Sequence, residues 1–314
     1  MNVLGKARTP FLFIIDFEQH KPIVRPLSEV DPNELLYDFH GVHNHSAVFS
    51  SDTRLRMTRS SLDFAVYRRA FDYVVHQLQT GNSFLVNLTF PTEIQINLSL
   101  QELFYRSQAR YKLWMRDALV VFSPESFIQI DKGYIRTYPM KGTIDATVPE
   151  ARQKILHDPK EMAEHTTIVD LLRNDLSRWA KQVEVKRFRY VEEIKTTRST
   201  LLQVSSEIVG TLPSGYHQHL GDILSSLLPA GSISGAPKPK TLEIIREAEQ
   251  GLRGYYTGVM GYYDGTVVDS GVMIRFIEQK GDRYFYRSGG GITARSVLEA
   301  EYRELHDKVY VPMM

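Results

Sequence analysis

The spacing of apolar residues along the chain predicts helices and strands that do not alternate strictly. From Ser61 to Leu78 the apolar side chains recur at helical spacing, and Gly81 is suited to end that helix. Residues Phe11 to Ile15 are all apolar, which predicts a buried strand. Further strands are expected over residues 83–97, 118–140, 183–210 and 255–292, and further helices over residues 99–111, 150–157, 159–180, 220–227, 241–250 and 296–310.

Local signals mark the ends of several of these elements. Ser99 and Ser296 are each followed three residues later by a glutamate, the capping-box pattern that starts a helix. Tight turns are predicted at residues 131–133, 264–265 and 280–281, where glycine follows a polar residue. Residues 227–240 are rich in small side chains and are expected to form a loop.

The order of the elements favours the α+β class. Runs of paired strands separated by helices indicate antiparallel sheets, since a doubly wound fold would alternate strand and helix throughout. Residues 1–60 are irregular after their first strand, and we expect them to form a short N-terminal segment packed on a core domain of residues 61–314.

Composition narrows the classes of function. The 38 basic and 37 acidic residues leave a net charge of +1, which gives no reason to expect nucleic acid or an anionic membrane surface as a partner. No cysteine is present, so disulfides, thiolate catalysis and cysteine metal sites are excluded. The first apolar run is too short for a signal sequence or a membrane span, and a cytoplasmic protein is expected.

Two pairs of glutamates could hold a metal ion. Glu161 and Glu164 are three residues apart on one predicted helix, and Glu301 and Glu304 are three apart on another. This spacing places both carboxylates of a pair on one helix face. Four facing carboxylates would repel one another unless a cation lay between them, and Mg²⁺ is the hard, partly hydrated ion that suits oxygen ligands. Solvated surface glutamates are the alternative.

Two glycine-rich stretches are candidates for anion sites. Residues 231–238 (GSISGAPK) lack the spacing and the hydroxyl residue of a nucleotide P-loop, which excludes that motif. Gly289, Gly290 and Gly291 follow a strand and precede a helix, where bare backbone amides can bind a carboxylate or phosphate. A tight turn with close packing is the alternative for these three glycines.

Three charged residues could act on a substrate. Arg275 lies within an apolar predicted strand, so it either points to solvent or, if it faces inward, needs an anion such as a carboxylate. Glu125 and Lys141 flank the predicted hairpin turn, so their strand ends could approach each other. An acid beside an amine can move protons while the amine attacks, although a surface ion pair would give the same pattern.

Taken together and in order, several stretches resemble the chorismate-binding enzymes, a family that includes anthranilate, isochorismate, salicylate and aminodeoxychorismate synthases. The resemblance runs from about Ser61 to the C-terminus and rests on the stretches IVDLLRNDLSR, PAGSISGAPKPKTLEII, YYTGVMGYYDG, MIRF, SGGGITARS and EAEYRELHDKV. It implies two facing antiparallel sheets flanked by helices, with the active site in the cleft between them. Lys141 in PMKGT occupies a position where anthranilate synthases have alanine and aminodeoxychorismate synthases have lysine.

The resemblance therefore implies component I of an aminodeoxychorismate synthase, a magnesium-dependent transferase in 4-aminobenzoate and folate biosynthesis. Chorismate and ammonia would be the substrates, and a glutaminase subunit would supply the ammonia. Lys141 would be the nucleophile and Glu125 the acid. The remaining implied residues are the magnesium ligands Glu161, Glu164, Glu301 and Glu304 and the substrate-binding residues Thr143, Gly258, Arg275, Gly289, Gly290, Gly291 and Lys308.

Some positions depart from the family pattern. Gln203 stands where many relatives have histidine, and glutamine cannot shuttle a proton. Phe276 and Arg295 also replace residue types that are usual in the family. The chain is shorter than many relatives at its N-terminal side, and we expect no tryptophan feedback. Another chorismate enzyme, such as anthranilate or isochorismate synthase, and a non-catalytic chorismate-binding protein are the alternatives.

Overall fold

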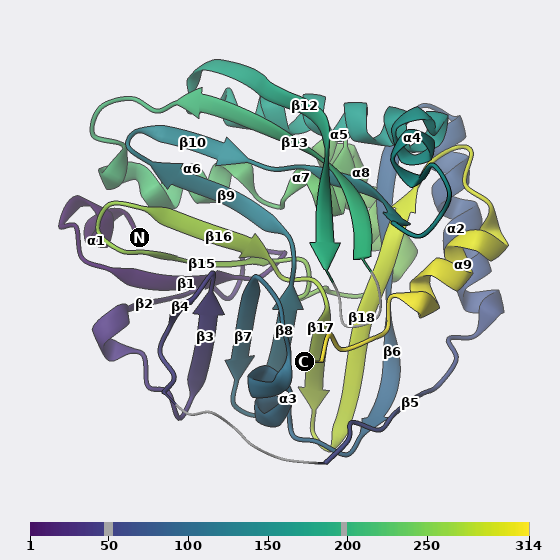
Figure 1. The fold of residues 1–314 in the computed structure, drawn as a ribbon, viewed down its shortest axis with the longest axis horizontal. Coiled ribbons are helices and arrows are strands. Elements are labelled where there is room, and N and C mark those ends of the chain that lie inside the picture. The colour runs from purple at the N-terminus through teal and green to yellow at the C-terminus, as the bar shows by residue number, and fades with distance from the viewer. Residues whose placement is uncertain (47–52, 196–199, 314) are drawn as a thin grey trace.

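Two antiparallel sheets with flanking helices form the fold, as Figure 1 shows. The computed structural model describes residues 1–46, 53–195 and 200–313. Within these ranges each sheet has nine strands, and every strand pair is antiparallel. The α+β class and the two antiparallel sheets are thus confirmed.

Sheet A contains the first strand of the chain near one edge. Its order is β11 (Met140–Asp145), β13 (Thr200–Thr211), β10 (Tyr134–Thr137), β9 (Ser126–Asp131), β16 (Val268–Val272), β15 (Val259–Tyr263), β1 (Phe11–Ile15) and β2 (Ile23–Pro26), with β12 (Lys181–Lys195) also beside β13.

Sheet B contains the glycine-rich strand β18. Its order is β14 (Gly235–Ala236), β6 (Leu85–Ile96), β18 (Arg283–Ile292), β17 (Phe276–Lys280), β8 (Leu119–Ser123), β7 (Tyr111–Met115), β3 (Leu35–Phe39) and β4 (Val42–His43), with β5 (Met57–Arg59) also beside β6.

Helices cover the sheets on their outer sides. In Figure 1, α2 and α9 lie together beside β18 and β6 at one end of the molecule. The helices are α1 (Asn2–Lys6), α2 (Phe64–Gln79), α3 (Leu100–Arg106), α4 (Ala151–His157), α5 (Pro159–Leu176), α6 (Leu220–Leu227), α7 (Gly231–Ser234), α8 (Lys238–Glu249) and α9 (Leu298–Asp307), with single 3₁₀ turns at Leu27–Glu29 and Tyr216–His219. None of the helices in the described ranges is long and apolar enough to cross a membrane.

The apolar run at the start of the chain is explained by burial on both faces of β1. Phe11 and Phe13 pack into the core between sheet A and the helices. Leu12 and Ile14 pack into the core shared by the two sheets, against residues of β3, β7 and β8. A strand covered on both sides carries apolar residues continuously, without alternation. The first 46 residues thus supply strands to both sheets.

Most of the predicted elements are confirmed. Helix α6 has the predicted bounds, and α5 begins at Pro159 with Asp158 as its N-cap. Ser99 and Glu102 form the predicted capping box of α3. The turn at residues 131–133 joins β9 and β10 as expected.

Two local predictions are wrong. Ser296 does not cap the last helix: α9 begins at Leu298 after Val297, and no side chain caps it. Residues 227–240 are not all loop, since they contain α7 and β14, and α8 begins at Lys238. In that stretch buried small residues allow close packing, which a pattern of small side chains does not distinguish from a loop.

The predicted meander over residues 255–292 is divided between the sheets. Strands β15 and β16 belong to sheet A, whereas β17 and β18 belong to sheet B. Arg275 lies at the crossing from β16 to β17 with a φ of +53°, so its expected place inside a strand is wrong. Likewise, Lys141 is not on the strand next to Glu125, because β11 pairs with β13. Both positions depend on hydrogen bonds with strands that are distant in the sequence, and the spacing of apolar residues does not reveal such pairing.

Candidate active site

Two crossings between the sheets lie side by side and carry Glu125 and Arg275. The chain passes from β8 to β9 at Glu125 and from β16 to β17 at Arg275. The N–H of Val272 donates to the carbonyl of Glu125, and the N–H of Phe122 donates to the carbonyl of Arg275, both at 3.0 Å. Backbone hydrogen bonds therefore hold the acid and the arginine at the junction of the two sheets.

The carboxyl group of Glu125 is held among polar and cationic groups. Its Oε1 accepts a short hydrogen bond from the hydroxyl of Ser232. Burial raises the pKa of Glu125 above its usual value, while the Ser232 bond and the charges of Lys141, Lys308 and Arg275 oppose that rise. A carboxyl whose pKa is raised retains its proton to higher pH, as a general acid requires.

A buried polar network fixes the residue that follows Glu125. The hydroxyl of Tyr111 donates to Oδ1 of Asp269 at 2.7 Å and shares a hydrogen bond of 2.9 Å with Oγ of Ser126. Nδ1 of His40 lies 2.9 Å from the other carboxylate oxygen of Asp269. Tyr111, Ser126 and Asp269 are buried and paired, and such groups fix local geometry, so the start of β9 is held in place.

The segment of residues 227–238, which carries Ser232 in α7, is also held in place by buried contacts. Lys238 is buried, and its Nζ donates to Asp175 at 2.7 Å and to the carbonyl of Leu227 at 2.9 Å. A Cβ atom at Gly235 would lie 1.8 Å from the carbonyl oxygen of Leu85, so only glycine fits there. The stretch GSISGAPK thus serves as a packed support for Glu125, a role that its composition alone did not reveal.

An irregularity in β11 directs Lys141. The register between β11 and β13 shifts between Met140 and Thr143, and Gly142 has a φ of +83°. Bulges re-aim side chains and increase local twist. Nζ of Lys141 lies 3.9 Å from Oε2 of Glu164, with the lysine side chain 20% exposed. A Cβ atom on Gly291 would lie 3.3 Å from the same Nζ, so β18 passes close beneath the amine.

The four predicted metal ligands lie close to glycines of the strands: Glu301 and Glu304 approach the same glycine, whereas Glu161 and Glu164 approach glycines of two different strands. Glu301 and Glu304 of α9 face Gly290, where a Cβ atom would lie 3.5 Å from Oε2 of Glu301 and 3.3 Å from Oε1 of Glu304. Glu164 of α5 approaches Gly291, since a Cβ atom there would lie 3.7 Å from its Oε2. Oε2 of Glu161 lies similarly close to Gly142.

The chemistry of this arrangement suits a hard cation. Carboxylate oxygens come from two helices toward two adjacent glycines whose missing side chains leave room beside them. In the ranges that the structure describes, no three or more His, Asp or Glu side chains have the mutual spacing of a formed metal site. The magnesium site therefore stays a prediction that rests on the donor chemistry and the glycines.

Cationic side chains border the same region. Nζ of Lys308 donates to the carbonyl of Gly289 at 2.9 Å and pairs with Glu304 at 2.6 Å. The guanidinium of Arg275 donates to the carbonyl of Lys308 at 3.1 Å and lies over the ring of Tyr310, 4.6 Å from its centroid. These contacts place Arg275, Lys308 and the glycines of β18 within one region, as predicted.

Thr143, Gln203 and Gly258 complete the set of predicted site residues. Thr143 is exposed on β11 and lies opposite Gln203 of β13 in the register. Gly258 is buried against β1, where a Cβ atom would lie 2.2 Å from the carbonyl oxygen of Ile15. Close packing accounts for that glycine, and its contact with substrate stays a prediction. His165, next to Glu164 in the sequence, is fully buried and shares a hydrogen bond of 2.7 Å with Ser206, which gives it a structural role.

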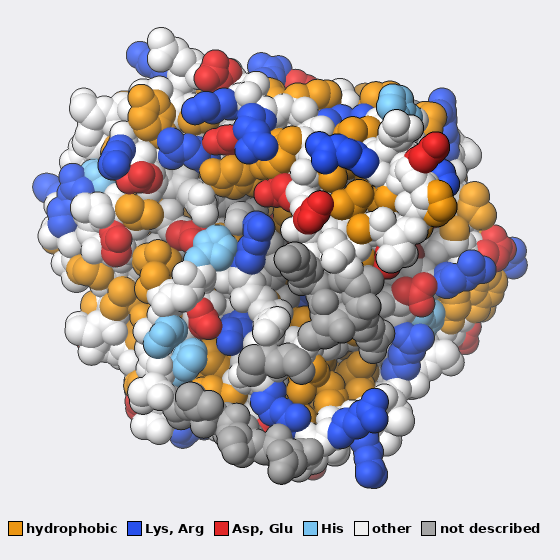
Figure 2. All heavy atoms as spheres, in the orientation of Figure 1, with side chains coloured by type: hydrophobic (Ala, Val, Ile, Leu, Met, Phe, Trp, Pro, Cys, Tyr) orange, Lys and Arg blue, Asp and Glu red, His pale blue; other side chains and the backbone are white. Residues whose placement is uncertain are grey.

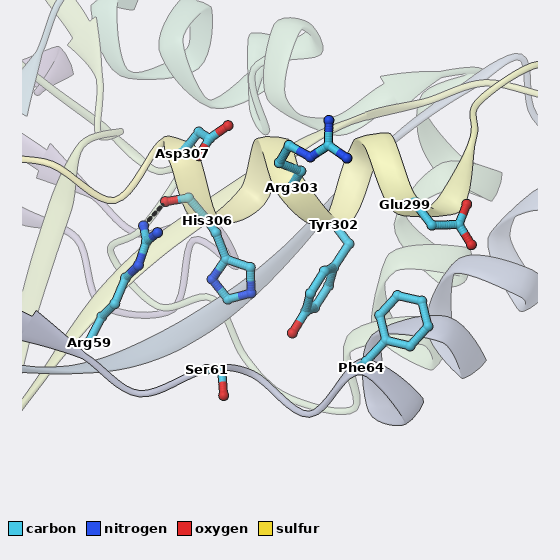
Figure 3. Close-up of a pocket in the computed structure, with 8 residues that line it drawn as sticks. All are labelled: Arg59, Ser61, Phe64, Glu299, Tyr302, Arg303, His306 and Asp307. Carbon is cyan, nitrogen blue, oxygen red and sulfur yellow. Dashed lines mark hydrogen bonds between the residues drawn. The ribbon is translucent and has the colours of Figure 1, made fainter.

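A broad groove lies on the outer side of α9, as Figure 3 shows. Its lining includes Phe64 of α2 and Tyr302 and His306 of α9, and it contains none of the predicted site residues. Glu301 and Glu304 are on the opposite side of the same helix, against β18.

On the face drawn in Figure 2, Lys and Arg side chains are interspersed with Asp and Glu.

Comparison with known proteins decides the family. A family model described as chorismate binding enzyme matches residues 16–314. The chain belongs to the chorismate-binding enzyme family. Over 312 residues it is 49% identical to an uncharacterized PabA-like protein of Haemophilus influenzae, covering 99% of this chain and 95% of the relative.

More distant members of the family carry specific names. The chain is 33% identical over 267 residues to aminodeoxychorismate synthase component 1 of Klebsiella aerogenes, covering 80% of this chain and 58% of that one. It is also 33% identical over 242 residues to anthranilate synthase component 1 of Archaeoglobus fulgidus, covering 76% and 57%. The matched regions thus span less than two thirds of these two relatives, and identity does not separate the two activities.

Solved structures agree on the fold. The menaquinone-specific isochorismate synthase of Escherichia coli superposes with a TM-score of 0.74 at 16% identity, covering 97% of this chain and 78% of that one. At this identity the likeness concerns the fold alone.

Proposed function

We propose that the chain is component 1 of an aminodeoxychorismate synthase and converts chorismate and ammonia into 4-amino-4-deoxychorismate. The observation that carries this proposal is the position of Lys141, whose amine is directed by the β11 irregularity toward Glu164 and the glycines of β18. An amine held at the junction of the sheets is suited to covalent catalysis.

The reaction would proceed in two displacements. The amine of Lys141 attacks C2 of the chorismate ring while Glu125 gives its proton to the departing C4 hydroxyl, so that water leaves and a C–N bond forms. Ammonia then adds at C4, the bond between C2 and the lysine breaks, and the excess proton returns to Glu125. The raised pKa of Glu125 supports its role as the acid in the first displacement.

The carboxylates of the substrate need cationic and N–H partners. Arg275 and Lys308 supply positive charge near Gly289. Gly289, Gly290 and Gly291 do not follow a strand as expected but lie within β18 and pair with β6, so only their N–H groups that point away from β6 would be donors for the substrate. Glu161, Glu164, Glu301 and Glu304 would hold Mg²⁺, which when bound would neutralise a substrate carboxylate and orient the ring. The protein groups thus fix the ring between the lysine and the acid.

Ammonia would come from a second protein. The relatives named as component 1 of a synthase imply a further component in those systems, and a glutaminase is the class of enzyme that releases ammonia from glutamine. Free ammonium at high concentration is expected to replace such a partner in a purified assay.

Product analysis tests the proposal. The purified chain is incubated with chorismate, Mg²⁺ and ammonium, and the products are identified by mass spectrometry. We expect 4-amino-4-deoxychorismate, and no such product from Lys141→Ala. Anthranilate as the product would favour the second candidate, an anthranilate synthase, which the equal identity to that relative supports. Isochorismate as the product would favour an isochorismate synthase, in which water takes the place of ammonia.

A binding protein without activity is the candidate from another class. It predicts saturable binding of chorismate but no turnover under any supply of ammonia. The assay is repeated with a glutaminase partner, because such a partner delivers ammonia directly to the site. Binding without turnover in both conditions would contradict the enzymatic proposal.

A further inference from the structure

Ser296 has a partner that its sequence pattern did not predict. Its hydroxyl does not cap α9, which begins after Val297 without a side-chain cap. Instead, Oγ of Ser296 donates to Oε1 of Glu301 at 2.7 Å. The same Oγ accepts a hydrogen bond of 3.1 Å from the N–H of Thr293, and the N–H of Ser296 donates to the carbonyl of Thr293. A tight turn therefore fixes the serine before it contacts the glutamate.

The two carboxylate oxygens of Glu301 face different surroundings. Oε1 accepts the hydrogen bond from Ser296. Oε2 lies on the side of Gly290, 3.5 Å from where a Cβ atom would be, close to the position at which Oε1 of Glu304 also approaches. Glu301 is only 4% exposed, so the orientation of its carboxylate is set by protein groups more than by water. The serine bond thus directs one oxygen toward the predicted metal site.

We propose that Ser296 is a positioning residue that orients Glu301 for binding Mg²⁺. The inference rests on the proposed function, because it takes Glu301 as a metal ligand. Metal-ligating carboxylates are usually held by a further hydrogen bond, and loss of that bond typically lowers metal affinity by about 10- to 100-fold. The affinity falls because the ligand must then give up conformational freedom when the ion binds.

The chain offers a matched control at another helix. Ser99 also donates its hydroxyl to a glutamate, since its Oγ bonds Oε2 of Glu102 at 2.8 Å. There the serine also accepts from the N–H of Glu102 and caps α3, remote from the glutamate pairs in sequence. Ser99→Ala therefore removes the same kind of hydrogen bond, with a cost in helix stability but no contact with the predicted metal ligands.

Isothermal titration calorimetry with Mg²⁺ alone tests the inference on the full chain. The proteins are the natural sequence, Ser296→Ala, Ser296→Thr and Ser99→Ala. We expect Ser296→Ala to raise the Kd for Mg²⁺ by about 10- to 100-fold, and Ser296→Thr, which keeps the hydroxyl, to stay within a few-fold of the natural protein. Ser99→Ala is expected to lower the Tm and to leave the Kd unchanged.

The outcomes separate this inference from the proposed function. If the natural protein binds Mg²⁺ and Ser296→Ala binds it equally well, the positioning role is wrong and the metal site stands. If the natural protein binds no Mg²⁺ up to millimolar concentration, the proposed metal site fails and the role of Ser296 fails with it. If Ser296→Ala does not fold, Ser296→Cys is measured in its place, since a thiol is a weak donor of similar size. A Mg²⁺ affinity of Ser296→Cys equal to that of Ser296→Thr would overturn the inference.

Discussion

The amine of Lys141 lies 3.9 Å from Oε2 of Glu164, so the proposed nucleophile and a predicted metal ligand share one contact. Both side chains are largely buried, with exposures of 20% for Lys141 and 10% for Glu164. A bound substrate would therefore contact Lys141 while a bound metal ion contacts its partner Glu164. Under the proposed function, Glu164 would couple the lysine to the bound metal ion.

Removal of the charge on Glu164 is expected to weaken Mg²⁺ binding. Glu164→Gln keeps the size of the side chain but loses a charged oxygen ligand. Because loss of a supporting group alone costs about 10- to 100-fold in metal affinity, loss of a ligand should cost at least as much. Calorimetry measures the Kd, and Glu192→Gln on β12 serves as a control, since Glu192 accepts from Ser205 and is not among the predicted ligands. An unchanged Kd in Glu164→Gln would remove it from the metal site.

Glu125→Gln is expected to lower kcat by about 10²- to 10⁴-fold, the usual contribution of a general acid. Glutamine fills the same space and can accept from Ser232, but it has no proton to give to the C4 hydroxyl. KM for chorismate should change little. Steady-state kinetics with ammonium as the nitrogen source measures both constants, and a kcat within a few-fold of the natural protein would contradict the assignment of Glu125 as the acid.

The hydrogen bond from Ser232 to Glu125 makes a prediction about pH. Glu125 must be protonated to act as an acid, so kcat falls as the pH rises through its pKa. The Ser232 bond favours the ionised carboxylate and lowers that pKa. Ser232→Ala should therefore raise the pKa and shift the alkaline limb of the kcat profile to higher pH. Ser234→Ala is the matched control, because that hydroxyl donates to the carbonyl of Ala230 instead. A limb that shifts equally in both variants would argue against a specific effect on Glu125.

Burial of His165 predicts acid sensitivity of the fold. Burial, together with the charges of Arg189 and Lys141, lowers the pKa of His165 from 6.5 to about 4. The neutral form is therefore favoured in the folded state, and its contribution to stability is complete above pH 6.5 and is lost as the pH falls toward 4. The free energy of unfolding should drop by about 3 kcal/mol over this window from this residue alone.

His165→Gln isolates that contribution. Glutamine can still hydrogen-bond Ser206 but does not titrate. Urea unfolding at pH 7 and at pH 4.5 should show a smaller loss of stability in the variant than in the natural protein, by roughly 2–3 kcal/mol. Equal losses in the two proteins would mean that other groups govern unfolding in acid.

The sequence reveals local structure better than it reveals long-range pairing. Ser99 starts α3 through a capping box within one turn, and this prediction and the predicted helix start at residue 159 are confirmed. Arg275 was misplaced because the chain leaves sheet A at Val272 and enters sheet B at Phe276, a choice made by strands far away in sequence. Ser296 was misassigned because its glutamate partner was expected three residues on, whereas the bond goes to Glu301.

In the candidate site too, features that depend on neighbouring residues can be predicted from the sequence, and contacts between distant residues cannot. The glutamate pairs are recognisable in the sequence because a spacing of three on a helix is a local property. The closeness of Glu301 and Glu304 to Gly290 is seen only in the folded structure, and their role as metal ligands stays a prediction. The bond of Ser232 to Glu125 was missed, since the two residues are separated by 107 positions in the chain. The small residues at 231–236 suggest a loop as readily as close packing, and they give no signal for the side chain that they support.

Mass spectrometry of the intact protein tests the central claim most directly. The purified chain is mixed with chorismate and Mg²⁺ in the absence of ammonia, so that the second displacement cannot occur, and is then quenched and weighed. We predict a mass increase equal to chorismate minus one water, located on the peptide that contains Lys141, and no increase in Lys141→Ala. Turnover of chorismate with ammonium without any adduct on Lys141, and at an equal rate in Lys141→Ala, would contradict the account.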